Sequence, residues 1–329
     1  MNINQKKVSL LSPCYNVEKY ISDFLESILA QNYDSLEVIL VDDGSTDTTP
    51  QIIKSYQKAF EDRGITLKYI RKENGGQASA MAVGLPYVSG EYLIWPDSDD
   101  ILLKNSIQTR VEYMDTHPEC GIVRCNGYVF TEGALDKPTG KVSPKMHRTV
   151  DLEDFVRFIV PWCPGCYMVR MDAWLKTNPE RKIFCSKCGQ NIQMLLPIVS
   201  EYTCHYLDEY VYGYILHENS HSHQIRGYEY DSQHIDDMKE CVFETLNILT
   251  GDYSRYLAIH DSFNRWIHFQ TAWRYQRTDE MKKYEIIMRN NNEFYFDYKL
   301  MNSIKPDSSA SKILRYASIF RRYILRKGI

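Results

Sequence analysis

The stretch that decides the fold runs from Ser9 to Asp47 and reads SLLSPCYNVEKYISDFLESILAQNYDSLEVILVDDGSTD. Apolar runs at 8–11 and 36–41 are each followed by a polar cluster, which predicts two buried strands. Between them, apolar residues recur at positions 21, 24, 25, 28 and 29, the spacing of one helix face. A strand, a helix and a second strand in this order predict part of a parallel sheet covered by helices.

The same alternation continues to residue 129. We expect Thr49 to cap a helix with Pro50 at its first helical position, strands at 66–70, 92–95 and 121–129, and a helix through 107–114. The pattern is irregular from 130 to 220 and helical from 225 to 290. The predicted fold class is therefore α/β, with a mostly parallel sheet flanked by helices and a C-terminal helical extension.

Composition excludes several classes of protein. The chain has 329 residues, of which 43% are apolar, and no run of 18 apolar residues, which argues against a disordered chain and a membrane-spanning helix. The N-terminus lacks the pattern of a signal peptide, so we expect a cytoplasmic protein. A net charge of −4 argues against nucleic acid as a partner.

Polar clusters follow three of the first four predicted strands: Pro13-Cys14-Tyr15-Asn16, Asp42-Asp43-Gly44-Ser45 and Asp97-Ser98-Asp99-Asp100. Each cluster alone is typical of a turn or a helix cap. Because the carboxyl ends of parallel strands meet at one edge of a sheet, the acids should converge there. Converging carboxylates favour Mg²⁺ or Mn²⁺, which prefer oxygen ligands and share them with substrate phosphates.

Together with ENGGQASAMAVGL at 73–85 and GEYLIWPDSDDIL at 90–102, these blocks resemble the family-2 glycosyltransferases of GT-A fold. The resemblance is close over 6–125 and looser to 223. It implies an enzyme that transfers a sugar, with inversion, from a nucleotide-diphosphate donor such as a UDP-sugar to a glycan or lipid-linked acceptor, in surface polysaccharide synthesis. It also implies a nucleotide-binding half at 1–105 and an acceptor half at 106–223, followed by a helical extension at 224–307 and a tail at 308–329.

The resemblance implies roles for individual residues. Pro13, Tyr15 and Asn16 would frame the uridine, and Asp42 would contact the base, with Asp43 and Ser45 in the same loop. Asn74 and Gly75 match a glycine-rich turn beside the nucleotide, and Asp97, Ser98 and Asp99 match the D-x-D motif. Asp97 and Asp99 would be the ligands of the Mg²⁺ or Mn²⁺ ion.

The sequence departs from the family pattern where the catalytic base is expected. The family's Glu-Asp pair aligns with Gln190 and Asn191, and neither amide accepts a proton at neutral pH. His217 is expected to assist at the metal site. The other candidates for a base in the second half are Glu201, Asp208, Glu218, His221 and His223.

Two cysteine pairs form C-x₂-C-x₁₈-C-x₂-C, the spacing of a structural zinc site: Cys163, Cys166, Cys185 and Cys188. Because the segment lies within the glycosyltransferase resemblance, and because YMVRMDAWL between the pairs predicts a strand and a helix, reduced thiols are favoured over zinc.

The last 22 residues carry six basic side chains and no acid, which leaves the rest of the chain at about −10. An amphipathic basic helix at 308–329 predicts either an anchor on an anionic membrane surface or a helix docked on the acidic body. The oligomeric state is not predicted.

Rival functions remain open. Gln190 and Asn191 favour a nucleotide-sugar or glycan-binding protein with impaired catalysis. A haloacid-type phosphatase would use Asp97 and Asp99, but that motif normally opens its domain. A nicotinamide dehydrogenase is disfavoured because no G-x-G-x-x-G follows the first strand.

Overall fold

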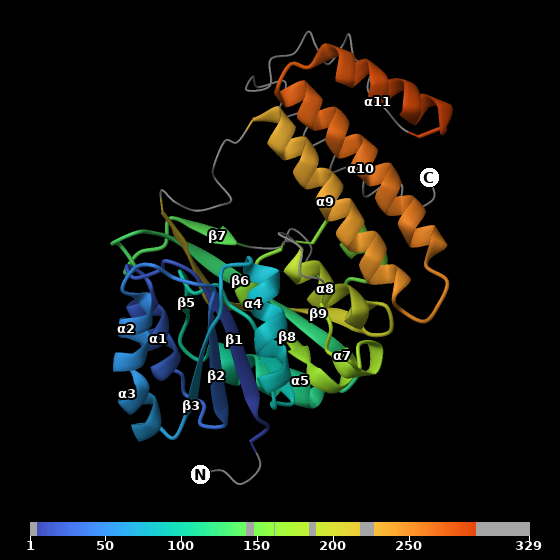
Figure 1. Cartoon of the computed structure of the whole chain (residues 1–329). Helices are drawn as coiled ribbons and strands as arrows, with labels where there is room; N and C mark the ends of the chain where they lie inside the picture. Colours follow the sequence, from blue (N-terminus) through green and yellow to red (C-terminus); the bar gives the residue numbers. More distant parts are fainter. Residues whose placement is uncertain (1–4, 143–147, 161, 184–188, 218–226, 294–329) are drawn as a thin grey trace. The chain divides into compact units, whose positions relative to one another are not determined.

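The computed structural model describes residues 5–142, 148–160, 162–183, 189–217 and 227–293 (Figure 1). The chain divides into two compact units. The first comprises Met1–Leu152, Val160–His223 and Ile248–Thr250, and the second comprises Glu153–Ile159, Gln224–Asn247 and Gly251–Ile329. The predicted tail at 308–329 and the last part of the predicted helical extension, 294–307, lie outside the described residues.

The first unit is built on a sheet that has nine strands in the described residues, in the order β3-β2-β1-β4-β8-β6-β9-β5, with β7 beside β6. Its strands are β1 (Val8–Cys14), β2 (Leu36–Asp42), β3 (Thr66–Arg71), β4 (Tyr92–Ile94), β5 (Ile101–Leu102), β6 (Cys120–Thr131), β7 (Gly140–Val142), β8 (Tyr167–Arg170) and β9 (Thr203–Leu216).

The helices between these strands are α1 (Ile21–Leu29), α2 (Thr49–Ser55), α3 (Gln57–Asp62), α4 (Gln77–Gly84), α5 (Ser106–Thr116), α6 (Leu152–Val156), α7 (Met171–Thr177) and α8 (Gln190–Val199). Two short 3₁₀ turns, η1 (Leu85–Tyr87) and η2 (Pro164–Cys166), precede β4 and β8. The α/β fold class and the strand-helix alternation of the first 125 residues are confirmed.

The parallel part of the sheet is β3-β2-β1-β4. β8 then pairs antiparallel with both β4 and β6, while β6 and β9 are parallel to each other. The register sets Cys14 opposite Asp42, so the polar residues that follow β1 and β2 emerge side by side. The sheet therefore brings the sequence-distant polar clusters to one edge.

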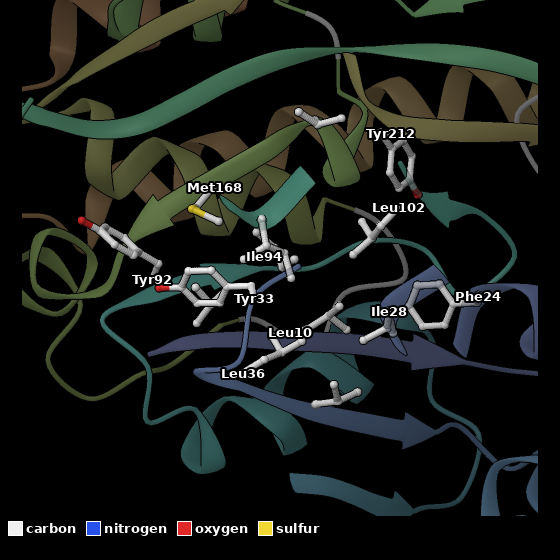
Figure 2. Close-up of a cluster of buried hydrophobic side chains, with 14 of the residues drawn as sticks. Leu10, Phe24, Ile28, Tyr33, Leu36, Tyr92, Ile94, Leu102, Met168 and Tyr212 are labelled. Carbon is white, nitrogen blue, oxygen red and sulfur yellow. The ribbon is translucent and has the colours of Figure 1, made fainter. Parts of the chain in front are cut away.

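Both faces of β1 and β2 are covered: successive side chains along a strand point to opposite faces, and every residue of these two strands is buried. Leu10 belongs to the apolar cluster that includes Phe24 and Ile28 of α1 (Figure 2). The opposite face meets α4, where a Cβ on Gly84 would lie 2.2 Å from Leu11 Cδ1. A glycine at this position lets α4 approach the sheet.

Some sequence predictions need correction. The N-cap of α2 is Thr48 rather than Thr49, so Pro50 is the second helical residue. The stretch at 130–220 is not irregular: it contains β8 and β9 as well as α7 and α8. β8 and α7 match the strand and helix that YMVRMDAWL predicts, whereas α8 and β9 escaped detection, α8 because Pro197 lies inside it.

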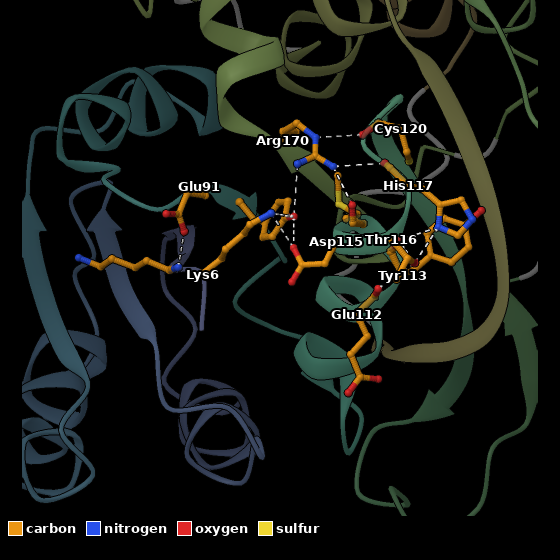
Figure 3. A network of polar contacts seen from close by, with 12 residues as sticks. Lys6, Glu91, Glu112, Tyr113, Asp115, Thr116, His117, Cys120 and Arg170 are labelled. Carbon is orange, nitrogen blue, oxygen red and sulfur yellow. Dashed lines mark hydrogen bonds and ion pairs between the residues drawn. The ribbon is translucent and has the colours of Figure 1, made fainter. Parts of the chain in front are cut away.

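A polar network fastens the amino-terminal edge of the sheet, opposite the polar clusters (Figure 3). The Arg170 guanidinium of β8 donates to the carbonyl oxygens of Met114, at 2.8 Å, and Cys120, at 3.3 Å. Lys6 forms an ion pair with Asp115 at 2.8 Å. These contacts hold α5 against the middle of the sheet. They involve none of the polar clusters at the carboxyl edge.

The second unit contains α9 (Tyr228–Asn247), α10 (Ser254–Arg274) and α11 (Thr278–Asn290), as the helical pattern predicts. Its apolar core includes Trp266, Phe269, Trp273, Met281 and Met288. No helix in the described ranges is long and apolar enough to cross a membrane.

Candidate active site

The candidate site lies at the carboxyl ends of β1, β2 and β4, where the Asp43 amide donates to the Cys14 carbonyl oxygen at 2.9 Å. This bond continues the pairing of β1 and β2 for one residue beyond the strands. Parallel strands place their last residues at a common edge, and this geometry collects the polar clusters of three separate stretches.

Asp42 ends β2 with no exposed surface. Its Oδ1 accepts the Ser45 backbone N–H at 2.8 Å, and its Oδ2 accepts the Tyr69 hydroxyl at 2.6 Å. Arg71 Nε lies 3.7 Å from Oδ2. Both carboxylate oxygens thus have donors from the chain, so Asp42 shapes the loop that follows it.

Asp43 holds the glycine-rich turn. One carboxylate oxygen accepts the Lys72 ammonium at 2.6 Å and the Gly75 amide at 3.0 Å, and the other accepts the Gly76 amide at 2.7 Å. Gly76, at φ 88°, leads into α4 in the left-handed region that glycine adopts without strain. The turn with Asn74 and Gly75 is therefore fixed to the end of β2.

The loop after β1 packs against the loop after β2. Asn16 has a left-handed φ of 51°; its amide donates to Ser45 Oγ at 3.0 Å, and its Oδ1 accepts the Thr46 amide at 2.8 Å. Tyr15 is 46% exposed, while Pro13 is buried in register with Val41. An exposed ring beside a polar edge can stack on a planar ligand.

The acid loop, Asp97 to Asp100, follows β4, and its members differ in environment. Asp100 is buried, and its carboxylate accepts the Tyr212 hydroxyl at 2.6 Å and the Ile215 amide at 2.7 Å. The Tyr212 hydroxyl also receives the Asp97 backbone N–H at 3.2 Å. Burial and the charges of Asp99 and Asp97 raise the pKa of Asp100 well above its usual range. Asp100 is a structural anchor of the loop.

Asp97 and Asp99 remain for a ligand. In the described part of the chain, the Asp97 carboxylate has no hydrogen-bond or ion-pair partner, and burial followed by the charge of Asp99 raises its pKa to about 7. Asp99 Oδ2 lies 3.0 Å from His217 Nε2, and the His217 ring stacks on Tyr20 with 4.5 Å between centroids. The structure thus brings His217, at the end of β9, to the acid loop.

Gln190 and Asn191 begin α8 and contact Gln77 and Trp95 from the first part of the chain. The Trp95 indole N–H donates to Asn191 Oδ1 at 2.8 Å, and the Gln190 amide donates to Gln77 Oε1 at 2.7 Å. Trp95 lies between β4 and the acid loop, and Gln77 is the first residue of α4. Both amides therefore join the start of α8 to the edge that carries the acids.

Comparison with known proteins agrees with this geometry. The sequence profile described as Glycosyl transferase family 2 matches residues 9–177, just over half of the chain. The chain belongs to glycosyl transferase family 2. The match spans β1 to α7 and so includes all three polar clusters.

Individual relatives support the family assignment. The minor teichoic acid biosynthesis protein GgaB of Bacillus subtilis (strain 168) is 28% identical over 196 residues, which are 59% of this chain and 21% of that protein. The matched stretch spans 40% or less of the length of several curated relatives.

Solved structures share the fold. S. aureus TarS (residues 1–349) has a TM-score of 0.59 at 21% identity, over 81% of this chain and 74% of that chain, and it is also solved with UDP-GlcNAc. The mannosyltransferase PcManGT from Pyrobaculum calidifontis, solved with GDP-Man and Mn²⁺, has a TM-score of 0.57 at 16% identity, over 92% of this chain and 84% of that chain.

The acid loop of this family-2 protein suits a divalent cation that completes its shell with phosphates. No group of three or more His, Cys, Asp or Glu side chains is arranged to hold a metal within the described ranges. Asp97 nevertheless offers an unpartnered carboxylate whose ionised form a cation would stabilise. Mg²⁺ needs only one or two protein carboxylates when a substrate supplies phosphate oxygens.

The other predicted bases are placed elsewhere or lie beyond the described residues. Glu201, past the far end of α8, pairs with Lys176 at 2.5 Å. Asp208, on β9, accepts a hydrogen bond from the Asn126 side-chain amide at 2.9 Å. Asp208 precedes His217 by nine residues of extended chain, about 30 Å, so it lies far from the acid loop. Glu218, His221 and His223 lie outside the described residues.

Half of the predicted zinc site can be described. The Cys166 amide donates to the Cys163 carbonyl oxygen at 3.1 Å, in the turn that leads into β8. A hydrogen bond with Cys166, together with burial, raises the pKa of the Cys163 thiol well above its usual range. Cys185 and Cys188 lie outside the described residues. The strand and helix predicted between the pairs are confirmed as β8 and α7.

Sequence reasoning missed Trp95, Gln77 and Tyr212. Trp95 lies two residues before Asp97, so its position was a usable signal. Tyr212 holds the acid loop from 112 residues away, and no local pattern announces such a contact.

Proposed function

We propose that this chain transfers a hexose from a nucleoside-diphosphate sugar, with UDP as the nucleotide, to a hydroxyl of a glycan or lipid-linked acceptor. The observation that carries the proposal is the pair Asp97 and Asp99 at the carboxyl end of β4, beside the loops of β1 and β2, in a member of glycosyl transferase family 2.

Tyr15 would stack on the base, as its exposure suggests, with Pro13 and Asn16 framing the nucleoside. The resemblance implies that Asp42 contacts the base, but both of its oxygens already accept hydrogen bonds from the chain, so Asp42 would instead order the loop around the nucleoside together with Asp43 and Ser45. Asn74 and Gly75 would lie beside the nucleotide in the turn that Asp43 holds.

Asp97 and Asp99, with Ser98 between them and His217 beside Asp99, would hold Mg²⁺ or Mn²⁺. The ion, when bound, would offset the negative charge that develops on the leaving diphosphate. The chain's own part is to position the two carboxylates, through Tyr212 and Asp100, where the diphosphate reaches them.

In the transfer, the acceptor oxygen forms a bond to C1 of the hexose while the bond from C1 to the diphosphate oxygen breaks. The acceptor's proton passes to a base or to water, and the nucleoside diphosphate leaves with the electron pair. Attack from the face opposite the leaving group would invert C1. Asn191 and Gln190 cannot take this proton.

Support for the donor class comes from the structural neighbours, of which TarS is solved with UDP-GlcNAc and PcManGT with GDP-Man and Mn²⁺. Support for a surface glycan as acceptor comes from GgaB, which is named for teichoic acid biosynthesis. Anchoring of the enzyme on an anionic membrane through 308–329 remains part of the proposal.

A thermal-shift panel tests the proposal. UDP, GDP, UDP-glucose, UDP-galactose, UDP-GlcNAc, UDP-GalNAc and GDP-mannose are each added with Mn²⁺ or EDTA. A ligand at 100 times its Kd stabilises a protein by about 2.7 kcal/mol. The nucleotide that the protein binds should therefore raise the melting temperature in the presence of Mn²⁺ but not in EDTA. The shift should vanish in Asp99→Asn and persist in Asp62→Asn, an exposed control. No shift with any nucleotide would overturn the proposal.

A second function is that of a nucleotide-sugar-binding protein with impaired catalysis. One observation favours it: the side-chain amides of Gln190 and Asn191, which cannot take a proton, are hydrogen-bonded to Gln77 and Trp95. It predicts a Mn²⁺-dependent shift without release of nucleoside diphosphate from any sugar nucleotide in the panel. Release of UDP or GDP on incubation with Mn²⁺ would decide for the transferase.

A further inference from the structure

The orientation of the Asn191 side chain is fixed by a group that can only donate. An indole nitrogen has one N–H and no lone pair for hydrogen bonding, so its partner must be an oxygen. The Trp95 Nε1–H lies 2.8 Å from Asn191 Oδ1, and Trp95 itself is buried. If the Asn191 side-chain nitrogen stood in place of Oδ1, its NH₂ group would face the Trp95 N–H, and two donors cannot form a hydrogen bond. The amide NH₂ of Asn191 therefore points away from Trp95.

This NH₂ group is available to a ligand. Asn191 is half-buried, and among the described residues its NH₂ group has no hydrogen-bond partner. A half-buried donor that makes no hydrogen bond to the protein can exchange solvent for a ligand oxygen. With Oδ1 already committed to Trp95, the group recognises only atoms with a lone pair, such as hydroxyl or carbonyl oxygens.

The order of strands indicates which part of a nucleotide sugar reaches this donor. The nucleoside loops follow β1 and β2, whereas the acid loop follows β4 on the other side of β1. Since neighbouring strands are about 4.8 Å apart, β2 and β4 are separated by about 10 Å. A nucleotide with its base at the β1–β2 loops and its diphosphate at Asp97 would extend its sugar toward the start of α8.

We propose that the NH₂ group of Asn191 donates a hydrogen bond to an oxygen of the hexose in the nucleotide-sugar donor, with Trp95 as its positioning residue. The inference rests on the proposed function and gives residue 191 a task in sugar recognition. The neutral amide binds the hexose without adding a third charge beside Asp97 and Asp99.

Isothermal titration calorimetry in Mn²⁺ tests the inference with UDP, UDP-glucose, UDP-GlcNAc, GDP and GDP-mannose as probes. The quantity of interest is the ratio of the Kd of the free nucleotide to the Kd of its sugar nucleotide. Loss of one hydrogen bond typically costs about 1 kcal/mol, so Asn191→Ala should lower this ratio about fivefold to tenfold. The Kd of the free nucleotide should stay the same, because the amide would not touch it.

Two further variants separate sugar recognition from a structural role. Trp95→Phe removes the indole donor and should lower the ratio as Asn191→Ala does, with no further loss in the double variant, because Trp95 acts through Asn191. Asn191→Asp keeps an oxygen for Trp95 but replaces the donor by a lone pair, so at pH 8 its ratio should be no higher than that of Asn191→Ala.

Trp174→Phe is the matched control. Trp174 is fully buried in α7, and its indole nitrogen has no hydrogen-bond partner among the described residues. This substitution should leave the ratio unchanged. Should Trp95→Phe fail to fold, the two Asn191 variants carry the test alone.

An unchanged ratio in Asn191→Ala, an increased ratio in Asn191→Asp, or additive losses in the double variant would each overturn the inference. The proposed function would survive these outcomes, since the wild-type protein would still bind nucleotide. Absence of nucleotide binding by the wild-type protein would overturn both.

Discussion

Replacing Asp97 with asparagine should stabilise the protein in the absence of metal while it removes a metal ligand. The ionised Asp97 carboxylate is disfavoured by burial and by the neighbouring charge of Asp99, and it has no partner among the described residues. Asparagine is nearly isosteric and carries no charge, so it avoids this cost. The gain in stability would identify Asp97 as a residue kept for binding at the expense of the fold.

The magnitude follows from the pKa. Asp97 has a pKa of about 7, against 3.8 for an ordinary aspartate. Since a tenfold change in an equilibrium constant is about 1.4 kcal/mol, ionised Asp97 costs the fold up to about 4 kcal/mol. The side chain keeps some contact with solvent, so we expect a gain of about 2 kcal/mol at pH 8.

The gain should depend on pH. A carboxyl with a raised pKa holds its proton in the folded state after the unfolded state has lost it. The cost is therefore absent below about pH 4, grows through the window up to about pH 7, and is complete above it. At pH 5 the advantage of Asp97→Asn should shrink to less than about 1 kcal/mol.

Urea unfolding in EDTA, followed by tryptophan fluorescence at pH 5 and pH 8, measures both values. Asp62→Asn is the control, because Asp62 is exposed and forms only a surface ion pair with Lys58; it should change stability by less than about 0.5 kcal/mol. The reasoning is refuted if Asp97→Asn is no more stable than wild type at pH 8, or if its gain is the same at both pH values.

Three further predictions concern the same edge. Gly44→Ala, at φ 83°, would place a Cβ 2.9 Å from the Asn74 nitrogen and should weaken UDP binding in calorimetry at least about tenfold; Gly64→Ala, at φ 71° with open space around it, should not. Tyr212→Phe leaves a buried carboxylate with one donor fewer, so the free energy of unfolding in urea should fall by about 1–3 kcal/mol, and an unchanged value would contradict the anchoring role. Mn²⁺-dependent UDP binding should strengthen from pH 5.5 to 8 as Asp97 loses its proton, and a flat profile would argue against Asp97 as a ligand.

Several features were predictable because they depend on neighbours in the chain. Periodicity predicted α1, β1 and β2, since a helix face and a buried strand impose apolar spacings that can be read locally. The break at Asn74 and Gly75 was likewise readable, because glycine marks the turn before α4. The elements between 130 and 217 were harder to predict, since a short strand such as β8 and a helix with an internal proline such as α8 carry weak periodic patterns.

The sequence by itself determined that acids and small polar residues follow consecutive parallel strands, and sheet geometry then requires them to share one edge. Only the tertiary structure decided which of these groups are free to meet a ligand. Tyr69 and Tyr212 occupy the carboxylates of Asp42 and Asp100, while the Asp97 carboxylate has no partner in the described ranges. Trp95 and Asn191 meet across 96 positions of the chain. Hydrogen-bond partners at such separations depend on how the strands and helices pack, and no local pattern of residues encodes them.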